Sequence, residues 1–263
     1  MDLGLKDRVA VVLASSKGLG RGAAEALALE GCNLAICARN QVELEQAAQT
    51  IREQSGRDVL AIVCDVAAPA ALDRFFGAIL AKFGRVDVLV NNAGGPPAGN
   101  SSDFSDTDWF TAYQLTLMSV VRACRHVVPG MIKQRWGRIL NITSVSVKQP
   151  LPGMILSNTF RPAVAGFAKS LANELAPYGV LVHCLLPGAF LTDRNRSLGS
   201  AIAEERGIEF DEVVQEWEQG VPLGRMGDPS EFGDLVAFLA SERCSFTTGT
   251  CIAIEGSLIK SLT

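Results

Sequence analysis

Short apolar runs alternate along the chain with longer segments of helical periodicity. Seven such runs lie at residues 8–14, 32–38, 59–64, 86–91, 138–144, 180–187 and 250–255. Apolar and polar residues do not alternate strictly in these runs, as they would in a strand with one face in water. Continuous apolar runs are typical of parallel strands covered by helices on both sides. The pattern predicts an α/β fold, a doubly wound parallel sheet of about seven strands with helices on both faces.

Residues that favour helix ends lie between these runs. Asn40 and Glu43 have the spacing of a capping box, in which each side chain bonds the backbone of the other. Ser105 and Asp108 repeat that spacing before a long helix, and Pro69 occupies the first position of another. The segments between the apolar runs are therefore predicted to be helices.

Residues 189–228 interrupt the alternation between the sixth and seventh apolar runs. They contain two helix-like segments, AIAEERG and FDEVVQEWEQ. A long insertion beyond the carboxyl end of a strand suits a substrate lid, and the alternative is a purely structural excursion. We expect residues 1–263 to form one domain with a substrate-lid insertion at about 189–228.

The bulk composition argues against several classes of protein. The chain has 263 residues, a net charge of −4 and scattered basic residues, which argues against a nucleic-acid or anionic membrane partner. No apolar run approaches the roughly 20 residues of a transmembrane helix. Seven Cys without a C-x-x-C pair argue against a disulfide framework and a structural zinc site. We expect no metal site and a reducing, cytoplasmic location.

The first apolar run continues into the glycine-rich stretch ASSKGLG (14–20), which precedes an amphipathic helical segment. Gly18 and Gly20 allow a tight turn whose backbone can approach a diphosphate, and the next helix directs its positive N-terminus at that group. In an alternating α/β chain this arrangement predicts a Rossmann-type dinucleotide site. The alternative is that these glycines are ordinary turn residues.

The end of the second apolar run, CARN, indicates which dinucleotide binds. NAD sites usually place Asp or Glu here, to accept from the ribose 2′-hydroxyl. In this chain Ala38 has that position and Arg39 follows, with Lys17 in the glycine-rich turn as a second cation. Both cations suit a 2′-phosphate, so we expect NADP(H) in preference to NAD(H). Alternatively, both are solvated surface residues.

Several motifs together resemble the short-chain dehydrogenase/reductase family. They are ASSKGLG (14–20), NNAG (91–94), NITS (141–144), PGAFLT (187–192) and PLGRMGDPSEFGDLVAFLASERCSFTTGTCIAIEG (222–256). The resemblance covers nearly the whole chain, and the last stretch is most similar to 3-oxoacyl-[acyl-carrier-protein] reductases. One departure is Ala14 at the position of the family's first motif glycine. We expect this change to be mild, because it adds one methyl group.

The resemblance implies a cofactor site at the carboxyl ends of the strands. It places Asp65 at the adenine, Asn91 on the adenosine ribose side, and Pro187, Gly188 and Thr192 around the nicotinamide amide. The full set of expected cofactor-binding residues is Ser15, Ser16, Lys17, Gly18, Leu19, Gly20, Arg39, Asp65, Val66, Asn91, Ala93, Gly94, Arg161, Pro187, Gly188 and Thr192.

The resemblance also implies four catalytic positions, of which one is conventional. In this family a Tyr transfers the proton, a Lys four residues later lowers its pKa and holds the ribose, a Ser binds the substrate oxygen and an Asn anchors a relay water. Ser144 matches the Ser. The Tyr position holds Ser157, the Lys position Arg161 and the Asn position Thr116. Neither of the chain's two Tyr can fill the Tyr position by a shift in register.

These substitutions remove the usual proton donor. A Ser hydroxyl is a far weaker acid than a phenol, and Arg161 stays protonated, so Arg161 supplies charge and hydrogen bonds but no proton. Candidate substitutes are Lys148, Tyr113, or a water held by Ser144, Ser157 and Asn158. Ser144 and Arg161 could instead form a cradle for an oxyanion or carboxylate. We expect both His, His126 and His183, to be structural.

Three functions remain open at this point. The first is an NADP(H)-dependent oxidoreductase acting on a small carbonyl or alcohol substrate, with a 3-oxoacyl group as one candidate. The second is a dinucleotide-binding sensor or partner subunit without reductase activity, which the altered catalytic positions favour. The third is a non-redox enzyme on the same fold. The full set of nicotinamide contacts favours the first, and the resemblance implies a homotetramer or homodimer.

Overall fold

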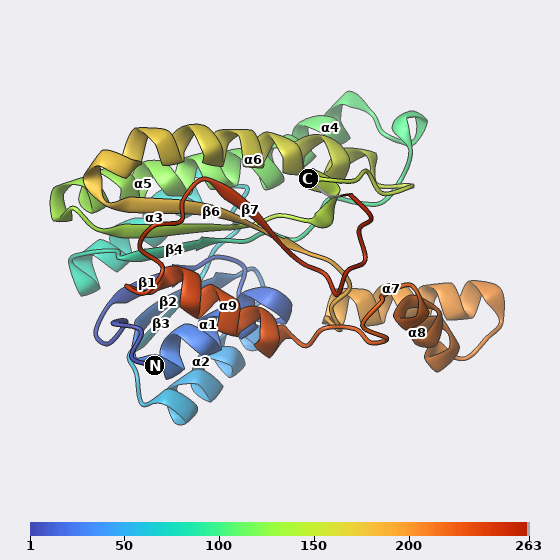
Figure 1. Ribbon diagram of the computed structural model, residues 1–263, viewed down its shortest axis with the longest axis horizontal. Coiled ribbons are helices and arrows are strands. Elements are labelled where there is room, and N and C mark those ends of the chain that lie inside the picture. Colours follow the sequence, from blue (N-terminus) through green and yellow to red (C-terminus); the bar gives the residue numbers. More distant parts are fainter. Residues whose placement is uncertain (262–263) are drawn as a thin grey trace.

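Seven parallel strands form one sheet in the order β3-β2-β1-β4-β5-β6-β7 in the computed structural model, which describes residues 1–261 (Figure 1). The strand bounds are β1 Val9–Val12, β2 Asn33–Ala38, β3 Val59–Val63, β4 Val88–Asn91, β5 Gly137–Ile142, β6 Val180–Pro187 and β7 Thr250–Ile254. Each coincides with a predicted apolar run. The expected α/β fold is confirmed.

Helices cover both faces of the sheet. Figure 1 shows α1, α2 and α9 on one face and α3, α5 and α6 on the other. The bounds are α1 Gly18–Leu29, α2 Gln41–Ser55, α3 Pro69–Phe83, α4 Asp106–Tyr113, α5 Ser119–Gln134, α6 Ile155–Leu175, α7 Asp193–Arg206, α8 Phe210–Gln219 and α9 Pro229–Ala240. Within residues 1–261 no helix is both long enough and apolar enough to cross a membrane.

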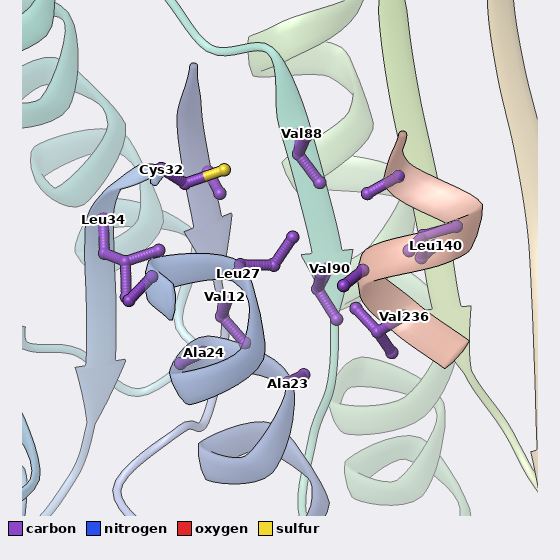
Figure 2. Packing of buried hydrophobic residues seen from close by; sticks show 14 of the residues in the cluster. Val12, Ala23, Ala24, Leu27, Cys32, Leu34, Val88, Val90, Leu140 and Val236 are labelled. Carbon is purple, nitrogen blue, oxygen red and sulfur yellow. The ribbon is translucent and has the colours of Figure 1, made fainter. Parts of the chain in front are cut away.

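The core consists of two apolar layers because successive strand residues point to opposite faces. In β1, Ala10 and Val12 belong to the layer under α1 and α9, whereas Val11 belongs to the layer under α3 and α5. Figure 2 shows the first layer, where Val12 lies close to Leu27 of α1. Full burial of such aliphatic side chains contributes about 1.5–3 kcal/mol each, so this packing fixes α1 against the sheet.

The chain reverses its direction of winding at β1. This strand pairs with β2 on one side and β4 on the other. The helices that follow β1 and β4 therefore lie on opposite faces, and a crevice opens at the carboxyl ends of the strands. A Cβ added at Gly22 of α1 would lie 2.3 Å from the carbonyl oxygen of Pro229, so α1 and α9 approach closely next to this crevice.

The predicted helix ends are partly confirmed. Ser105 and Asp108 form a reciprocal capping box, and Pro69 is the first residue of α3. Asn40 Oδ1 accepts from the amides of Val42 and Glu43, but the Glu43 carboxylate does not return a bond to Asn40. The capping box predicted at Asn40 is therefore only half formed. The Glu43 carboxylate does not bond the Asn40 amide because it pairs with Lys17 instead.

The long helix predicted after Ser105 is not continuous. It divides into α4 and α5, separated by a π-helical turn over Gln114–Met118. The extra residue in such a turn leaves backbone and side-chain groups in unusual positions, and π turns occur often at functional sites. Here the turn carries Thr116, one of the residues expected at the catalytic site.

The insertion at 189–228 forms a hairpin of two helices, α7 and α8, and backbone hydrogen bonds join the two ends of the insertion. The amide of Leu191 donates to the carbonyl of Gly227 at 2.9 Å, and the amide of Gly227 donates to the carbonyl of Ala189 at 2.9 Å. Between these points α7 and α8 pack against each other beyond the sheet (Figure 1). The hairpin begins soon after the carboxyl end of β6. Its action as a lid remains a prediction.

Candidate active site

A cavity of about 650 Å³ lies at the carboxyl ends of the central strands. Most of the expected cofactor residues line it, namely Ser16, Lys17, Gly18, Leu19, Arg39, Asp65, Val66, Ala93, Gly94, Arg161, Pro187 and Thr192. Four expected residues do not: Ser15, Gly20, Asn91 and Gly188. The cavity therefore collects residues from six separate turns into one site.

The glycine-rich turn has the shape that a diphosphate needs. Gly18 has a φ of +59° and lies opposite Thr192, whose side chain would be 3.6 Å from a Cβ at residue 18. A Cβ at Gly20 would lie 2.6 Å from the Ala14 carbonyl oxygen and 2.6 Å from Asn92 Nδ2. Gly18 therefore presents bare backbone to the cavity at the N-terminus of α1, which suits an anion, whereas Gly20 allows α1 to pack closely against the ends of β1 and β4.

The backbone of Ala14 has a conformation that is unfavourable for a residue with a side chain. Its φ is +48°, in the left-handed region that favours glycine. For an L-residue with a Cβ, this conformation costs about 1–2 kcal/mol. The expectation of a mild change was therefore wrong, because the cost comes from backbone conformation and not from the volume of one methyl group.

Two cations line the cavity beyond the ends of β1 and β2, Lys17 and Arg39, and they differ in their partners. Lys17 Nζ forms an ion pair with Glu43 Oε1 at 3.3 Å. The exposed side chain of Arg39 forms no hydrogen bond or ion pair with the rest of residues 1–261. Asp65 accepts from the Ala67 amide through Oδ1, which leaves its other oxygen available. Arg39 is thus the better placed of the two cations for a 2′-phosphate.

Asn91 is buried beneath the cavity. Its Nδ2 donates to Asn141 Oδ1 at 2.9 Å, and Asn141 Nδ2 donates to the carbonyl of His183 at 3.0 Å. Ser15 is likewise buried, with Oγ donating to the Val12 carbonyl at 2.8 Å. The Asn91 bond joins the neighbouring strands β4 and β5, whereas the Ser15 bond stays within the end of β1, and neither side chain lines the cavity. The next residue along, Asn92, does line it.

Three serines form a short array near the end of β5. Ser144 Oγ accepts from the Ser146 amide at 3.1 Å, and Ser146 Oγ lies 3.5 Å from Ser157 Oγ. Neither Ser144 nor Ser157 lines the cavity. The hydroxyl proton of Ser144 has no acceptor among residues 1–261, so it remains available for a bound group.

Arg161 reaches the cavity from α6. Its Nη1 donates to the Ile142 carbonyl at 2.7 Å, whereas its Nε is buried without a partner. Burial, and next the charge of Arg194, lower the pKa of Arg161 to about 10. The guanidinium is therefore still charged near neutral pH and has donor capacity left for a ligand.

Thr116 is buried in the π turn, and its Oγ1 has no hydrogen-bond partner. A buried hydroxyl without a partner is costly, so it usually marks a place for water or a ligand group. Thr116 does not line the cavity. The structure thus leaves unpaired polar groups at two of the altered positions, Thr116 and Arg161.

Comparison with known proteins decides the family. The family model described as enoyl-(acyl carrier protein) reductase matches residues 13–257. The chain belongs to the short-chain dehydrogenase/reductase family. The 3-oxoacyl-[acyl-carrier-protein] reductase FabG of Chlamydia trachomatis is 32% identical over 254 residues, which cover 97% of this chain and 98% of that protein. The family expected from the motifs is confirmed, and the protein is an oxidoreductase of this type.

Solved structures of family members are closely similar. L-sorbose reductase from Gluconobacter frateurii, in complex with NADPH and L-sorbose, has a TM-score of 0.97 and 32% identity, with 100% of both chains covered. A variant of actinorhodin polyketide ketoreductase with NADPH has a TM-score of 0.91 and 30% identity, covering 97% of this chain and 98% of that one. A catalytically inactive sensor has no support among these relatives.

The structure surrounds the three candidate replacements for the family's proton donor differently. Asn158 is committed to the backbone, because its Oδ1 accepts from the Leu151 amide and its Nδ2 donates to the Leu151 carbonyl. The ring of Tyr113 packs against Phe160 and does not line the cavity. Lys148 is also outside the cavity lining, as are Ser144 and Ser157, so the lining does not decide between these candidates. A water held by Ser144 and Ser157 is favoured because the hydroxyl proton of Ser144 has no acceptor among residues 1–261.

Several lining residues were missed by sequence reasoning. They are Ala14, Ala38, Asn40, Glu43, Cys64, Asn92, Gly95, Leu115, Ile142, Thr143, Asp193 and Arg194. Most are neighbours in sequence of residues that were expected. Arg194 follows Thr192 by two positions, and an Arg so close to a predicted nicotinamide contact was the available signal.

Proposed function

We propose that this protein is an NADPH-dependent reductase of a small-molecule carbonyl, or the reverse dehydrogenase. One observation carries the proposal: a single cavity connects Arg39 at the end of β2 with Thr143 and Arg161 next to the end of β5. An elongated dinucleotide needs such a path from its adenosine end to its nicotinamide end. The named activities of the relatives support the same conclusion.

The residues fit NADP(H). The backbone of Gly18 and Leu19 would hold the diphosphate, Arg39 the 2′-phosphate and Asp65 the adenine, while Thr192 would contact the nicotinamide amide. The observation that supports this fit is Gly18, the first residue of α1, which lines the cavity with bare backbone and has a positive φ of +59°. When bound, the nicotinamide supplies or accepts the hydride.

Ser144, Arg161 and water would bind the substrate oxygen, stabilise its charge and supply the proton. Ser144 would donate its hydroxyl to the substrate oxygen, since its own oxygen already accepts from the Ser146 amide. Arg161 would stabilise the negative charge that develops on that oxygen. A water in contact with Ser157 would deliver the proton, replacing the phenol of other family members.

Two further family expectations are part of this proposal. The α7–α8 hairpin would close over the substrate once it is bound. The chain would form a homotetramer or homodimer through the segments 106–134 and 152–177, which size-exclusion chromatography with light scattering would test. Neither changes the assignment of the cofactor site.

The test begins with cofactor binding and turnover. We expect purified protein to bind NADPH more tightly than NADH, and to oxidise it with at least one member of a panel of 3-oxoacyl thioesters, diketones, ketoses and oxo acids. Arg39→Gln should weaken NADPH binding about tenfold and leave NADH binding unchanged. Tight NADPH binding without turnover on any substrate would contradict the reductase function.

A second experiment restores the family's proton donor. The double variant Ser157→Tyr with Arg161→Lys should raise the reductase rate, because a positioned general acid typically contributes about 10²- to 10⁴-fold. The single variant Arg161→Lys is the control, since it lacks the phenol. A double variant no faster than the wild type would show that the pocket is built for another task.

A further inference from the structure

Two arginines, Arg161 and Arg194, line the same cavity near the ends of β4 and β5. Arg161 is anchored from α6 through its hydrogen bond to the Ile142 carbonyl at 2.7 Å. Arg194, the second residue of α7, donates through Nη2 to the Pro96 carbonyl at 3.2 Å. Its guanidinium lies directly over Gly95, in the loop after β4. Both residues line the cavity.

The two arginines form no ion pair within the part of the chain that the structure describes. Within residues 1–261 Asp193, the carboxylate beside Arg194, pairs with neither of them. The Nε of Arg161 is buried and has no partner. Burial, and next the charge of Arg194, lower the pKa of Arg161, as expected when a buried cation lies near another. A shared anion would relieve both the repulsion and the unpaired donor.

The phosphates of a dinucleotide have other partners. The glycine-rich turn and Arg39 follow β1 and β2, whereas Ile142 ends β5 and Pro96 follows β4. Because the sheet order is β2-β1-β4-β5, the carbonyls that hold the two arginines lie on the other side of β1 from Arg39. Ser144, two residues beyond Ile142, marks the place where the proposed function puts the substrate carbonyl.

We propose that Arg161 and Arg194 bind a carboxylate carried by the carbonyl substrate, so that the substrate is an oxo acid. This inference rests on the proposed reductase function and names its substrate class. A guanidinium fork matches the two oxygens of a carboxylate, and charge-assisted hydrogen bonds are the strongest of their kind. The ketone is reduced to an alcohol with uptake of one proton and oxidation of NADPH to NADP⁺, while the carboxylate is unchanged.

The test measures binding without turnover. Protein saturated with NADP⁺ is titrated in a calorimeter with 2-oxobutanoate, 3-oxobutanoate and 4-oxopentanoate, and with the methyl ester of each. We expect at least one acid to bind about tenfold more tightly than its ester, because the ester lacks the charge. Equal affinities for acid and ester across all three pairs would overturn the proposal.

Variants of α7 assign the effect to the arginine pair. Arg194→Gln should weaken binding of the preferred acid about tenfold and leave its ester unaffected, and Arg194→Lys should restore part of the affinity. Arg196→Gln, the same change on an exposed arginine of the same helix that does not line the cavity, should have no effect. Arg194 is exposed, so these variants should fold.

Two outcomes separate the site from its alternatives. If Arg194→Gln weakens NADPH binding as much as acid binding, Arg194 holds the cofactor and the proposal is overturned. If acids bind selectively through Arg194 but no carbonyl is reduced, the anion site stands and the reductase function fails. Calorimetry and NADPH oxidation therefore test the two claims separately.

Discussion

Lys17 Nζ lies 3.3 Å from Glu43 Oε1, across the turn that connects the glycine-rich loop to the adenosine end of the cavity. The positive charge of Lys17 is therefore partly offset before any ligand binds. Arg39 has no such partner within residues 1–261. Although sequence alone treats these two cations as equal, the structure favours Arg39 over Lys17 for the proposed contact with a 2′-phosphate, and the Glu43 carboxylate lines the same cavity.

Removal of the Glu43 carboxylate should therefore increase the preference for NADPH. We expect Glu43→Gln to tighten NADPH binding about threefold at low salt and to change NADH binding less, because NADH lacks the 2′-phosphate. The control is Glu45→Gln, an exposed carboxylate of the same helix that pairs with Arg52 and does not line the cavity. Fluorescence titration with both cofactors would measure it, and equal changes for NADPH and NADH would contradict it.

The left-handed conformation of Ala14 predicts a stabilising substitution. Because its φ is +48°, Ala14→Gly should raise the free energy of unfolding by about 0.5–1 kcal/mol, the relieved strain minus the entropy of a more flexible unfolded chain. Ala81→Gly on the exposed face of α3 should do the opposite, with a loss of about 0.5–1 kcal/mol. Urea denaturation would measure both, and destabilisation by Ala14→Gly would count against the assigned backbone conformation.

Because the Thr116 hydroxyl is buried without a partner among residues 1–261, we expect its removal to preserve stability and to lower activity. Thr116→Val should leave the protein as stable or about 1 kcal/mol more stable, since no protein hydrogen bond is lost. If the π turn holds a water of the proton path, the same change should lower kcat for carbonyl reduction. Thr143→Val is the contrast for stability, because Thr143 Oγ1 donates to the Leu185 carbonyl and its loss should destabilise by about 1 kcal/mol. Unchanged kcat in Thr116→Val would remove this residue from the mechanism.

His183 predicts a loss of stability in mild acid. Burial, and next the charge of Arg138, lower the pKa of His183 from 6.5 to about 4, so the folded chain holds this side chain neutral. The unfolded chain takes up a proton as pH falls through 6.5, and the folded chain does so only near 4. The stabilisation is therefore complete above pH 6.5 and falls by up to about 3 kcal/mol between pH 6.5 and 4.

The measurement is the pH dependence of urea denaturation over that window. His183→Gln should flatten the slope between pH 6.5 and 4, whatever its effect on stability at neutral pH. His126→Gln, which removes the chain's other histidine and leaves His183 in β6, should retain the slope. A slope that survives in His183→Gln would assign the acid sensitivity to other groups.

The sequence alone was sufficient for the fold and for half of the residues that line the cavity. Apolar runs define all seven strands to within a few residues, because burial on both faces forces nearly every strand position to be apolar. The glycine-rich turn, Arg39, Asp65 and Thr192 were also predictable, since each lies at a strand end and such ends meet at one edge of a parallel sheet.

Side-chain partners across separate elements were decided only by the tertiary structure. The pairing of Lys17 with Glu43, the positive φ of Ala14 and the π turn around Thr116 depend on how neighbouring elements pack, and no local pattern specifies them. Arg161 and Arg194 lie on different helices, and it is the packing of α6 and α7 around one cavity that brings their charges together. Strand periodicity follows from burial at each position, whereas such encounters follow from three-dimensional proximity.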